Sequence, residues 1–178
     1  TLTVPGDYAT IQAAIDAAED GDTVLVSPGT YEENIDFSGK AVRVTKTADS
    51  ALAIIDALGF GSAVTFDNGE GDLSVLNGFM IQNGSAGQGG GVFAGTDTAP
   101  VITNNTFFNN EAVNDGGGVF VGQNAQAQVI NNTFDTNFAT RGGSLFSADG
   151  ASPVIENNIM VNSPPGVFEI WADTLSSP

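Results

Sequence analysis

The sequence predicts an all-β chain wound into a parallel β-helix, a solenoid of about six to seven coils with a short capping α-helix at its N-terminal end. Two internal repeats lead to this prediction. The letters GGGVF at residues 89–93 recur at 116–120, and as GGSLF at 142–146. The letters VITNNTF at 101–107 are followed by QVINNTF at 128–134 and VIENNIM at 154–160. Both repeats advance in steps of 26 or 27 residues, and a fixed period is typical of repeat architectures.

The composition of each repeat favours strands over helices. Short apolar or alternating runs are separated by Gly, Asn, Asp and Ser, which are signals for strands and turns. One repeat is therefore expected to form one coil with about three short strands. Successive coils would stack about 4.8 Å apart, the spacing of hydrogen-bonded strands. Equivalent side chains then lie above one another in columns.

Three columns of apolar side chains are expected to face inward and form the core. A degenerate copy of the second repeat, SVLNGFM at residues 74–80, extends two of these columns. The columns are Val75, Ile102, Val129 and Ile155; Met80, Phe107, Phe134 and Met160; and Phe93, Phe120 and Phe146, with Phe168 as a candidate fourth member.

Asparagine forms a further column, made of Asn77, Asn104, Asn131 and Asn157. Each lies between two inward positions an odd number of residues apart, so the chain has to bend there. Asn tolerates the left-handed backbone conformation of a tight bend, and its amide can bond to the equivalent amide one coil away. We therefore expect a buried Asn ladder rather than a set of ligand-binding residues.

The chain is expected to be one domain, with an N-terminal cap at residues 1–22, irregular first coils at 23–73 and regular coils at 74–178. Helical spacing holds at Ile11, Ala14, Ile15 and Ala18. It predicts a helix at about residues 10–19, capped by Asp7 or Thr10 and ended by Gly21. This helix would cover the open edge of the first coil. The strands expected before the regular coils are residues 23–26, 35–37, 41–45, 52–55 and 64–66.

The C-terminal end suggests an unfinished stack. The letters LSSP at residues 175–178 look like the start of another coil. We expect either a fragment of a longer protein or a last coil left for a partner to cover, because an uncovered edge is a template for adding strands. Trp171 is expected to plug the core near this end, and the alternative is an interface anchor.

Residues 10–35, TIQAAIDAAEDGDTVLVSPGTYEENI, resemble the N-terminal start of right-handed parallel β-helix proteins of the pectin-lyase-like superfamily. The later coils, rich in glycine, SP and NN, look like repeat regions of large secreted bacterial and archaeal surface proteins. The resemblance implies a right-handed, single-stranded β-helix that is secreted or held at the cell surface. It implies no single activity, because the superfamily includes lyases, hydrolases, esterases, epimerases, adhesins and passive stalks.

Charge and composition exclude several function classes. The chain has 21 acidic and 4 basic residues, and its formal net charge is −17. Such a surface repels the phosphates of nucleic acids and of anionic membranes, so neither is an expected partner. No apolar run approaches the roughly 18 residues that a membrane-spanning helix requires. The absence of His and Cys removes the commonest general base, the commonest zinc ligand and any thiolate site.

Catalytic residues are not expected, and the candidates are weak. The resemblance to pectate-type lyases would require a basic residue as the base, with Ca²⁺ on acidic side chains. Arg141 is the only cation in the regular coils, with Asp135 and Glu156 as candidate neighbours, and an ordinary salt bridge is the alternative for Arg141. The residue sets of pectin methylesterases and of His-dependent polygalacturonases have no match here. A glycosidase needs two placed carboxylates, but nothing in the sequence selects a pair.

No cofactor is required, and Ca²⁺ is the candidate ion. Asp67, Glu70 and Asp72 share the short loop DNGEGD with two glycines, and oxygen ligands on such a loop suit Ca²⁺. An ordinary acidic turn is the alternative. Asn83, Asn104 and Asn131 lie in N-x-S/T triplets. The last two are expected to be buried in the ladder, which leaves Asn83 as the candidate glycan acceptor.

Two functions remain. We favour a non-catalytic extracellular or cell-surface β-helix with a structural or adhesive role, which self-associates through the edge of its C-terminal coil into filaments. The alternative is a carbohydrate-active enzyme, a polysaccharide lyase or glycoside hydrolase, or a polysaccharide-binding module that uses one long face. Polyuronates are poor ligands for either, because an acidic face repels them unless Ca²⁺ bridges the two.

Overall fold

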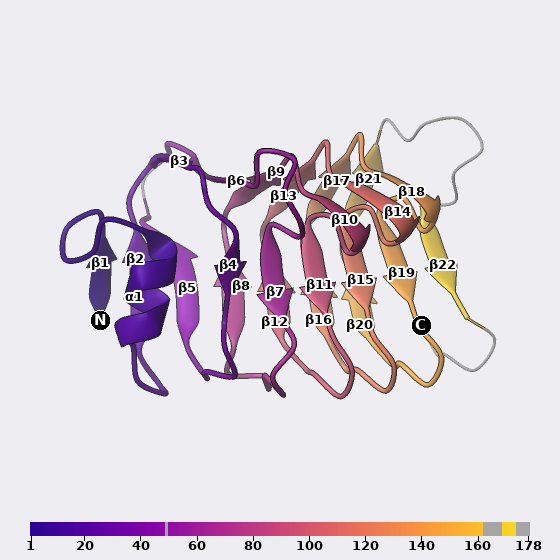
Figure 1. Ribbon diagram of the computed structural model, residues 1–178, viewed down its shortest axis with the longest axis horizontal. Helices are drawn as coiled ribbons and strands as arrows, with labels where there is room; N and C mark the ends of the chain where they lie inside the picture. Colours follow the sequence, from indigo (N-terminus) through magenta and orange to yellow (C-terminus); the bar gives the residue numbers. More distant parts are fainter. Residues whose placement is uncertain (49, 162–168, 174–178) are drawn as a thin grey trace.

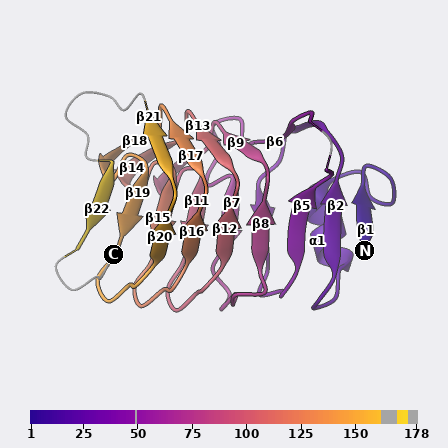
Figure 2. The ribbon, with the colours of Figure 1, turned by 180° about the vertical axis from the view of Figure 1, so that it is seen from behind.

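The computed structural model describes residues 1–48, 50–161 and 169–173, which form one elongated solenoid (Figure 1). The chain winds through about six turns as a single-stranded, right-handed parallel β-helix with one short helix. Figure 2, the view from behind, shows the opposite long face, along which a different row of parallel strands lies. The fold class predicted from the sequence is therefore confirmed.

Three sheets follow the solenoid axis, and successive coils add one strand to each. Sheet A consists, in spatial order, of β1 (Leu2–Val4), β2 (Thr23–Val26), β5 (Arg43–Lys46), β8 (Val75–Asn77), β12 (Val101–Thr103), β16 (Gln128–Ile130) and β20 (Val154–Glu156). Sheet B consists of β3 (Gly29–Tyr31), β6 (Ala53–Asp56), β9 (Met80–Gln82), β13 (Thr106–Phe108), β17 (Thr133–Asp135) and β21 (Ile159–Val161). Sheet C consists of β4 (Ile35–Asp36), β7 (Val64–Phe66), β11 (Val92–Ala94), β15 (Val119–Val121), β19 (Leu145–Ser147) and β22 (Ile170–Ala172).

A fourth sheet was not expected from the sequence, which predicted about three strands in a coil. Sheet D consists of β10 (Ser85–Gln88), β14 (Glu111–Asp115) and β18 (Phe138–Arg141), each placed between a strand of sheet B and a strand of sheet C along the chain. These segments carry little apolar alternation. For that reason the strand signal was too weak to separate them from turns.

The glycines of the repeated GGGVF letters allow two backbones to pass close together. Gly116 turns the chain with φ of 66°, a conformation that glycine adopts without a steric penalty. A Cβ atom added to Gly117 would lie 2.4 Å from the carbonyl oxygen of Phe138 and 2.6 Å from that of Gly143. The backbone at Gly117 therefore has no room for a side chain.

The core lies between sheets A, B and C, and two predicted columns are largely confirmed. Ile102 pairs with Val129, and Val129 with Ile155, in sheet A. In sheet B the column runs through Phe107, Phe134 and Met160. The rings of Phe107 and Phe134 are stacked with centroids 4.8 Å apart, and both are fully buried. Aromatic stacking along the axis thus fills the centre of the solenoid.

The first members of these two columns were predicted wrongly. The ladders place Leu76, not Val75, beside Ile102, and Ile81, not Met80, beside Phe107. Leu76 and Ile81 have no exposed surface. This coil is one residue shorter than the next at these positions, so a step of 27 residues selected the wrong neighbour.

The third column, Phe93, Phe120 and Phe146, is a stack but does not face the core as predicted. The residues on either side of Phe93, Val92 and Ala94, belong to the buried core. Because side chains of a strand alternate between its two faces, the Phe column lies on the outer face of sheet C. Its rings are parallel, with centroids 5.3 and 5.7 Å apart. Phe120 and Phe146 are nonetheless only 6% and 1% exposed, so the apolar pattern alone could not show on which face the column lies.

Trp171 continues this outer column, because it pairs with Phe146 in the ladder between β19 and β22. The prediction that it plugs the core is therefore wrong. Phe168, the other proposed member, and the letters LSSP at 175–178 lie outside the described residues.

An Asn ladder is present, but its register differs from the prediction by one residue. Asn104, Asn131 and Asn157 bend the chain, with φ between 56° and 59°, and Asn104 and Asn131 are exposed. The next residue in each coil faces inward. The Asn105 N–H donates to Asn132 Oδ1 at 2.9 Å, and the Asn132 N–H donates to Asn158 Oδ1 at 2.8 Å. The bend thus uses the first Asn of each NN pair and the buried ladder uses the second.

Asn77 is not a member of this bend column. It pairs with Thr103 in sheet A, and the bend position of its coil is taken by Gly78, with φ of 89°. Asn77 does accept a hydrogen bond from Asn104 Nδ2 at 2.8 Å. The link to the next coil is therefore real, but it runs along the outer surface.

The N-terminal end is covered by α1 (Ile11–Ala17), which packs against β1, β2 and β4. Thr10 is the N-cap, and its side chain accepts a hydrogen bond from the Ala13 N–H at 3.1 Å. The other proposed cap, Asp7, instead accepts hydrogen bonds from Thr3. The helix is shorter than the predicted 10–19. The five strands predicted before the regular coils are present, two of them with the predicted bounds and three shifted by one or two residues.

Candidate functional site

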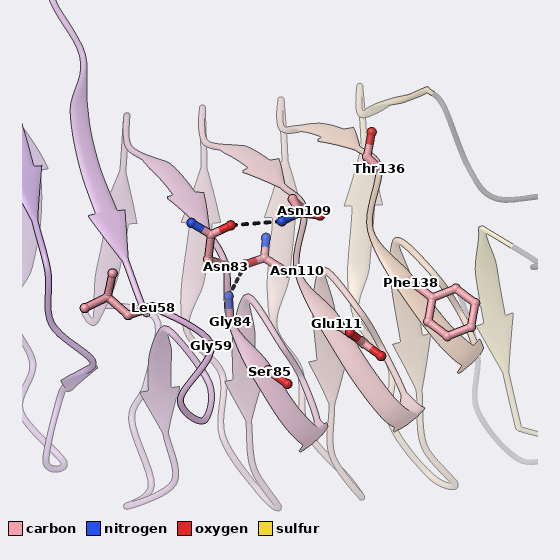
Figure 3. Close-up of a pocket in the computed structure, with 10 residues that line it drawn as sticks. All are labelled: Leu58, Gly59, Asn83, Gly84, Ser85, Asn109, Asn110, Glu111, Thr136 and Phe138. Atoms are coloured by element: carbon pink, nitrogen blue, oxygen red, sulfur yellow. Dashed lines mark hydrogen bonds between the residues drawn. The ribbon is translucent and has the colours of Figure 1, made fainter.

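An open groove follows the solenoid axis at the corner between sheets B and D (Figure 3). Its volume is about 530 Å³, and four consecutive coils line it. Each of the four coils contributes a bend residue after sheet B, and the last three also contribute the first residue of a sheet D strand. The bend residues are Leu58, Asn83, Asn109 and Thr136, and the first residues of the sheet D strands are Ser85, Glu111 and Phe138.

The floor of the groove is a second ladder of buried amides. The Gly84 N–H donates to Asn110 Oδ1 at 3.0 Å, and the Asn110 N–H donates to Asn137 Oδ1 at 3.1 Å. Asn110 Nδ2 also donates to the Ile81 carbonyl oxygen at 2.9 Å. Asn110 and Asn137 are 1% and 2% exposed. Buried amides with satisfied hydrogen bonds hold the floor in one conformation.

The rim of the groove is polar and is anchored on a buried carboxylate. Asn109 Nδ2 donates to Asn83 Oδ1 at 2.9 Å, and Asn83 Nδ2 donates to both oxygens of Asp56, at 3.0 and 3.1 Å. Gln82 Nε2 donates to Asp56 as well, at 2.6 Å. Burial is the largest influence on the pKa of Asp56 and raises it, but the donors Gln82, Asn83 and the Leu58 N–H together outweigh burial, so the net pKa lies below its usual value.

One side of the groove offers an aromatic ring and a carboxylate. The Phe138 side chain is 42% exposed and stands at the far end of the groove from Leu58 (Figure 3). Glu111 is exposed between Ser85 and Phe138 in the sheet D ladder. It is the only charged residue among the ten that line the groove.

A polar column lies at the other end of the sheet D strands. Arg141 Nε donates to Asp115 Oδ1 at 2.7 Å, and Arg141 Nη1 lies 3.4 Å from Asp173 Oδ1. Gln88 Nε2 donates to the second oxygen of Asp115 at 3.0 Å. The guanidinium also covers the Phe146 ring, 4.6 Å from its centroid. The hydrogen bond to Asp115 raises the pKa of Arg141, so the side chain stays charged.

The comparison with protein families supports the architecture. The family described as the right-handed β-helix region matches residues 38–174. The chain belongs to the right-handed β-helix family. No curated protein and no solved structure matches it. The match covers sheet D and the groove as well as the core, and membership in the pectin-lyase-like superfamily is consistent with it. The family indicates the fold of this β-helix and leaves its activity open.

The three weak catalytic candidates do not form one site in this β-helix. Arg141 lies at the end of β18 in sheet D, Asp135 in β17 of sheet B and Glu156 in β20 of sheet A. Asp135 accepts a hydrogen bond from the Thr136 hydroxyl at 2.8 Å. Arg141 forms ion pairs with Asp115 and Asp173, which agrees with the salt-bridge alternative.

The proposed calcium ligands are not arranged around a common point. Both oxygens of Glu70 accept backbone hydrogen bonds, from the Gly39 N–H at 2.8 Å and the Asn68 N–H at 2.9 Å. Glu70 is 1% exposed, and its role here is to brace one coil against the previous one. Within residues 1–48, 50–161 and 169–173, no group of three or more acidic side chains could hold a metal ion, so Asp67 and Asp72 have no such partner set.

The N-x-S/T triplets are placed differently from the prediction. Asn104 and Asn131 were expected to be buried, but both are exposed at the bends. Asn83 was the candidate glycan acceptor, and its Nδ2 donates to both oxygens of Asp56, whereas a glycan would replace one of the two hydrogens on this nitrogen. Modification of Asn83 stays a prediction. In the described part of the chain, no helix has the length and apolar character to span a bilayer.

Sequence reasoning missed the groove and the polar column. Asn110 and Asn137 are 27 residues apart, and Asp115 and Arg141 are 26 residues apart. These steps match the repeat period and could have indicated both pairings. The positions Ser85, Glu111 and Phe138 carry no such signal, because they share neither charge nor size.

Proposed function

We propose that this β-helix is a non-catalytic module of a secreted or cell-surface protein, with a structural or adhesive role. The observation that carries the proposal is the use of its polar side chains for bonds between coils. Arg141, the one cation among the weak catalytic candidates, is bonded to Asp115. The buried Asn side chains are bonded to the next coil and to backbone carbonyls. Side chains that are hydrogen-bonded between coils stabilise the solenoid and are not positioned to react with a substrate.

An activity screen tests the absence of catalysis. The protein is incubated with pectate, methylated pectin, alginate, xylan and β-glucan, with and without Ca²⁺, and the products are measured as new reducing ends and as unsaturated uronates. We expect neither product above the level of a heat-denatured control. Cleavage that is abolished by Arg141→Met or Asp135→Asn would refute the proposal.

Self-association through the C-terminal coil is the second part of the proposal. In the described part of the chain, β20, β21 and β22 are the last strands of sheets A, B and C, and one side of each pairs with no described strand. Ile159 and Val161 of β21 are 58% and 40% exposed. Apolar side chains beside open strand edges favour end-to-end addition of a second copy.

The oligomeric state tests this part independently of catalysis. Light scattering over a concentration series, with negative-stain microscopy, should show growing linear assemblies. Ile159→Lys should suppress them, because a charged edge residue blocks strand addition. Leu73→Lys is the matched control, since Leu73 is 67% exposed but lies outside the strands. A strict monomer at high concentration would refute end-to-end assembly.

A further inference from the structure

We propose that the groove between sheets B and D holds an extended basic segment of a partner protein, with one arginine side chain of that segment between Glu111 and Phe138 (Figure 3). This inference deepens the adhesive role proposed above by naming a class of partner. It rests on that role in one respect, that the bound segment is not cleaved. It does not depend on self-association, because the groove lies on the side of the solenoid and not at its end.

The first argument is a carboxylate beside an aromatic ring, both open to solvent. Glu111 and Phe138 are ladder partners in adjacent strands of sheet D, and the residues that follow them, Ala112 and Ala139, are buried. Because neighbouring side chains of a strand point to opposite faces, Glu111 and Phe138 both project outward. In the described part of the chain, the Glu111 carboxylate has no hydrogen bond and no ion pair. Both groups are therefore available to a ligand.

The second argument is that the other end of the same two strands holds a comparable pair, which the protein fills with its own arginine. Arg141 Nε donates to Asp115 Oδ1 at 2.7 Å, and the guanidinium lies over the Phe146 ring, 4.6 Å from its centroid. A planar guanidinium can bond to a carboxylate and stack on an aromatic ring at the same time. Glu111 and Phe138 offer the same two kinds of group without a cation, and an arginine from outside completes the set.

The third argument is charge, which favours a basic partner. The chain has 21 acidic and 4 basic residues, and no Lys or Arg is among the ten residues of the lining. Lys40 donates to three backbone carbonyl oxygens at the C-terminal end of α1, Arg43 and Lys46 belong to β5 of sheet A, and Arg141 is paired in sheet D. The fold thus directs its own cations elsewhere. An acidic surface attracts a basic segment and accelerates its association.

The fourth argument is the length and chemistry of the rest of the lining, which suit a peptide better than a small cation. Four consecutive coils line the groove, and Leu58, at the opposite end from Phe138, is 51% exposed. The amides of Asn83 and Asn109 present the donors and the acceptor that a peptide backbone requires. The buried ladder of Gly84 and Asn110 holds this wall in place, so little ordering is needed on binding.

The geometry of the groove also sets the spacing of the segment that it holds. Three steps between paired strands span about 14 Å, and an extended peptide advances about 3.4 Å for each residue. An apolar residue about four positions from the arginine would therefore contact Leu58. Residues four apart in an extended chain point to the same face, so both side chains can enter the groove together. A polymer of amino sugars has neither a planar guanidinium nor an aliphatic side chain for these two positions.

An NMR titration of the isotope-labelled protein, read from its backbone amide signals, tests the proposal. The probe is a blocked pentapeptide of leucine, threonine, serine, threonine and arginine, in that order. The matched peptide carries citrulline, an uncharged analogue, in place of arginine, and spermidine and chitosan oligomers are the cations that are not peptides. The arginine peptide should shift the signals of Ser85, Glu111 and Phe138. The citrulline peptide should bind about tenfold more weakly, because it loses the charge-assisted hydrogen bonds to the carboxylate.

Glu111→Gln and Phe138→Ser should each weaken binding of the arginine peptide about tenfold, through loss of the ion pair and of ring stacking. Asp97→Asn is the charge-matched control, since Asp97 is exposed at a bend outside the lining and the change removes the same unit of charge. Val113→Ser is the apolar control, because Val113 is 67% exposed in the same sheet and also lies outside the lining. Both controls should bind the peptide as the wild type does.

Equal weakening in Asp97→Asn and Glu111→Gln would show attraction to the overall charge alone and would overturn the proposal. It is also overturned if the arginine peptide shifts no groove signals, if the citrulline peptide binds equally well, or if spermidine or chitosan binds the groove more tightly. A peptide that is bound and cleaved would support the groove and refute the non-catalytic function. A peptide that does not bind, with no activity in the polysaccharide screen, would refute this inference alone, so the two proposals fail in distinguishable ways.

Discussion

The Arg141 guanidinium meets the Asp115 carboxylate at 2.7 Å, although 26 residues separate them in the sequence. The two are ladder partners in adjacent strands of sheet D. Asp115 is 3% exposed and also accepts a hydrogen bond from Gln88, one coil earlier. Polar residues of this solenoid therefore find their partners along its axis, at the distance of one repeat.

Replacing Arg141 should destabilise the protein, because the buried Asp115 carboxylate depends on it. In Arg141→Met the buried Asp115 carboxylate loses its charged donor, and we expect the free energy of unfolding to fall by about 1–3 kcal/mol. Asp115→Asn with Arg141→Met should cost less than the sum of the single changes, because the pair is coupled. Urea titration of the four proteins measures this coupling. Arg43→Met is the control, since Arg43 is exposed in β5; strict additivity would contradict the prediction.

The buried Asn ladder should be more sensitive than the exposed bend beside it. In Asn132→Ala the Asn105 N–H and the Ile102 carbonyl oxygen lose their partners, which should cost about 1–3 kcal/mol of stability for each unsatisfied group. Asn131→Gly keeps the left-handed bend without a side chain and should change stability by less than about 0.5 kcal/mol. Thermal unfolding followed by circular dichroism compares them. Equal losses would show that the ladder register is wrong.

Close backbone passage predicts intolerance of alanine at Gly118. A Cβ there would lie 2.5 Å from the Ser144 carbonyl oxygen and 2.7 Å from Phe134 Cδ1, so backbone or core must move. We expect Gly118→Ala to lose about 1–3 kcal/mol, the range of overpacked sites. Gly87→Ala is the control, because nothing lies within 4 Å of the added atom. A Gly118→Ala protein with wild-type Tm would contradict the close approach.

Asp56 should make a pH-dependent contribution to stability. Burial raises the pKa of Asp56, but the hydrogen bonds from the side-chain donors and from the Leu58 N–H together lower it by more than burial raises it. The folded-state pKa therefore lies below that of the unfolded chain. The contribution is therefore fully present above the unfolded value of about 4 and is lost as pH falls through the folded pKa. Asp56→Asn should cost about 1–3 kcal/mol at pH 7.

The difference in stability between wild type and Asp56→Asn, measured by urea titration from pH 7 down to pH 3, is the informative quantity. It should shrink as the pH falls below about 4. The comparison cancels most of the effect of the other carboxylates, which titrate in both proteins. A difference that grows on acidification would reverse the sign of the predicted pKa shift.

The repeat period, together with the strand and turn composition of each repeat, determined the architecture. Steps of 26 or 27 residues imply that equivalent side chains lie one coil apart, and Phe107, Phe134 and Met160 do so. Strands 23–26 and 64–66 were predicted with the bounds of β2 and β7. These features depend on local apolar patterns and on a regular translation along the axis, and both are visible in one chain.

Only the tertiary structure decided which face each column occupies. A period specifies how far apart equivalent residues lie, but not which way they point. Asn104 and Asn105 are adjacent and both recur, yet only the bend at Asn104 turns Asn105 inward. The outer position of the Phe93 column and the groove beside Phe138 depend on sheet D. Sheet D is formed by backbone pairing between distant segments with little apolar signal, and for that reason the sequence could not predict it.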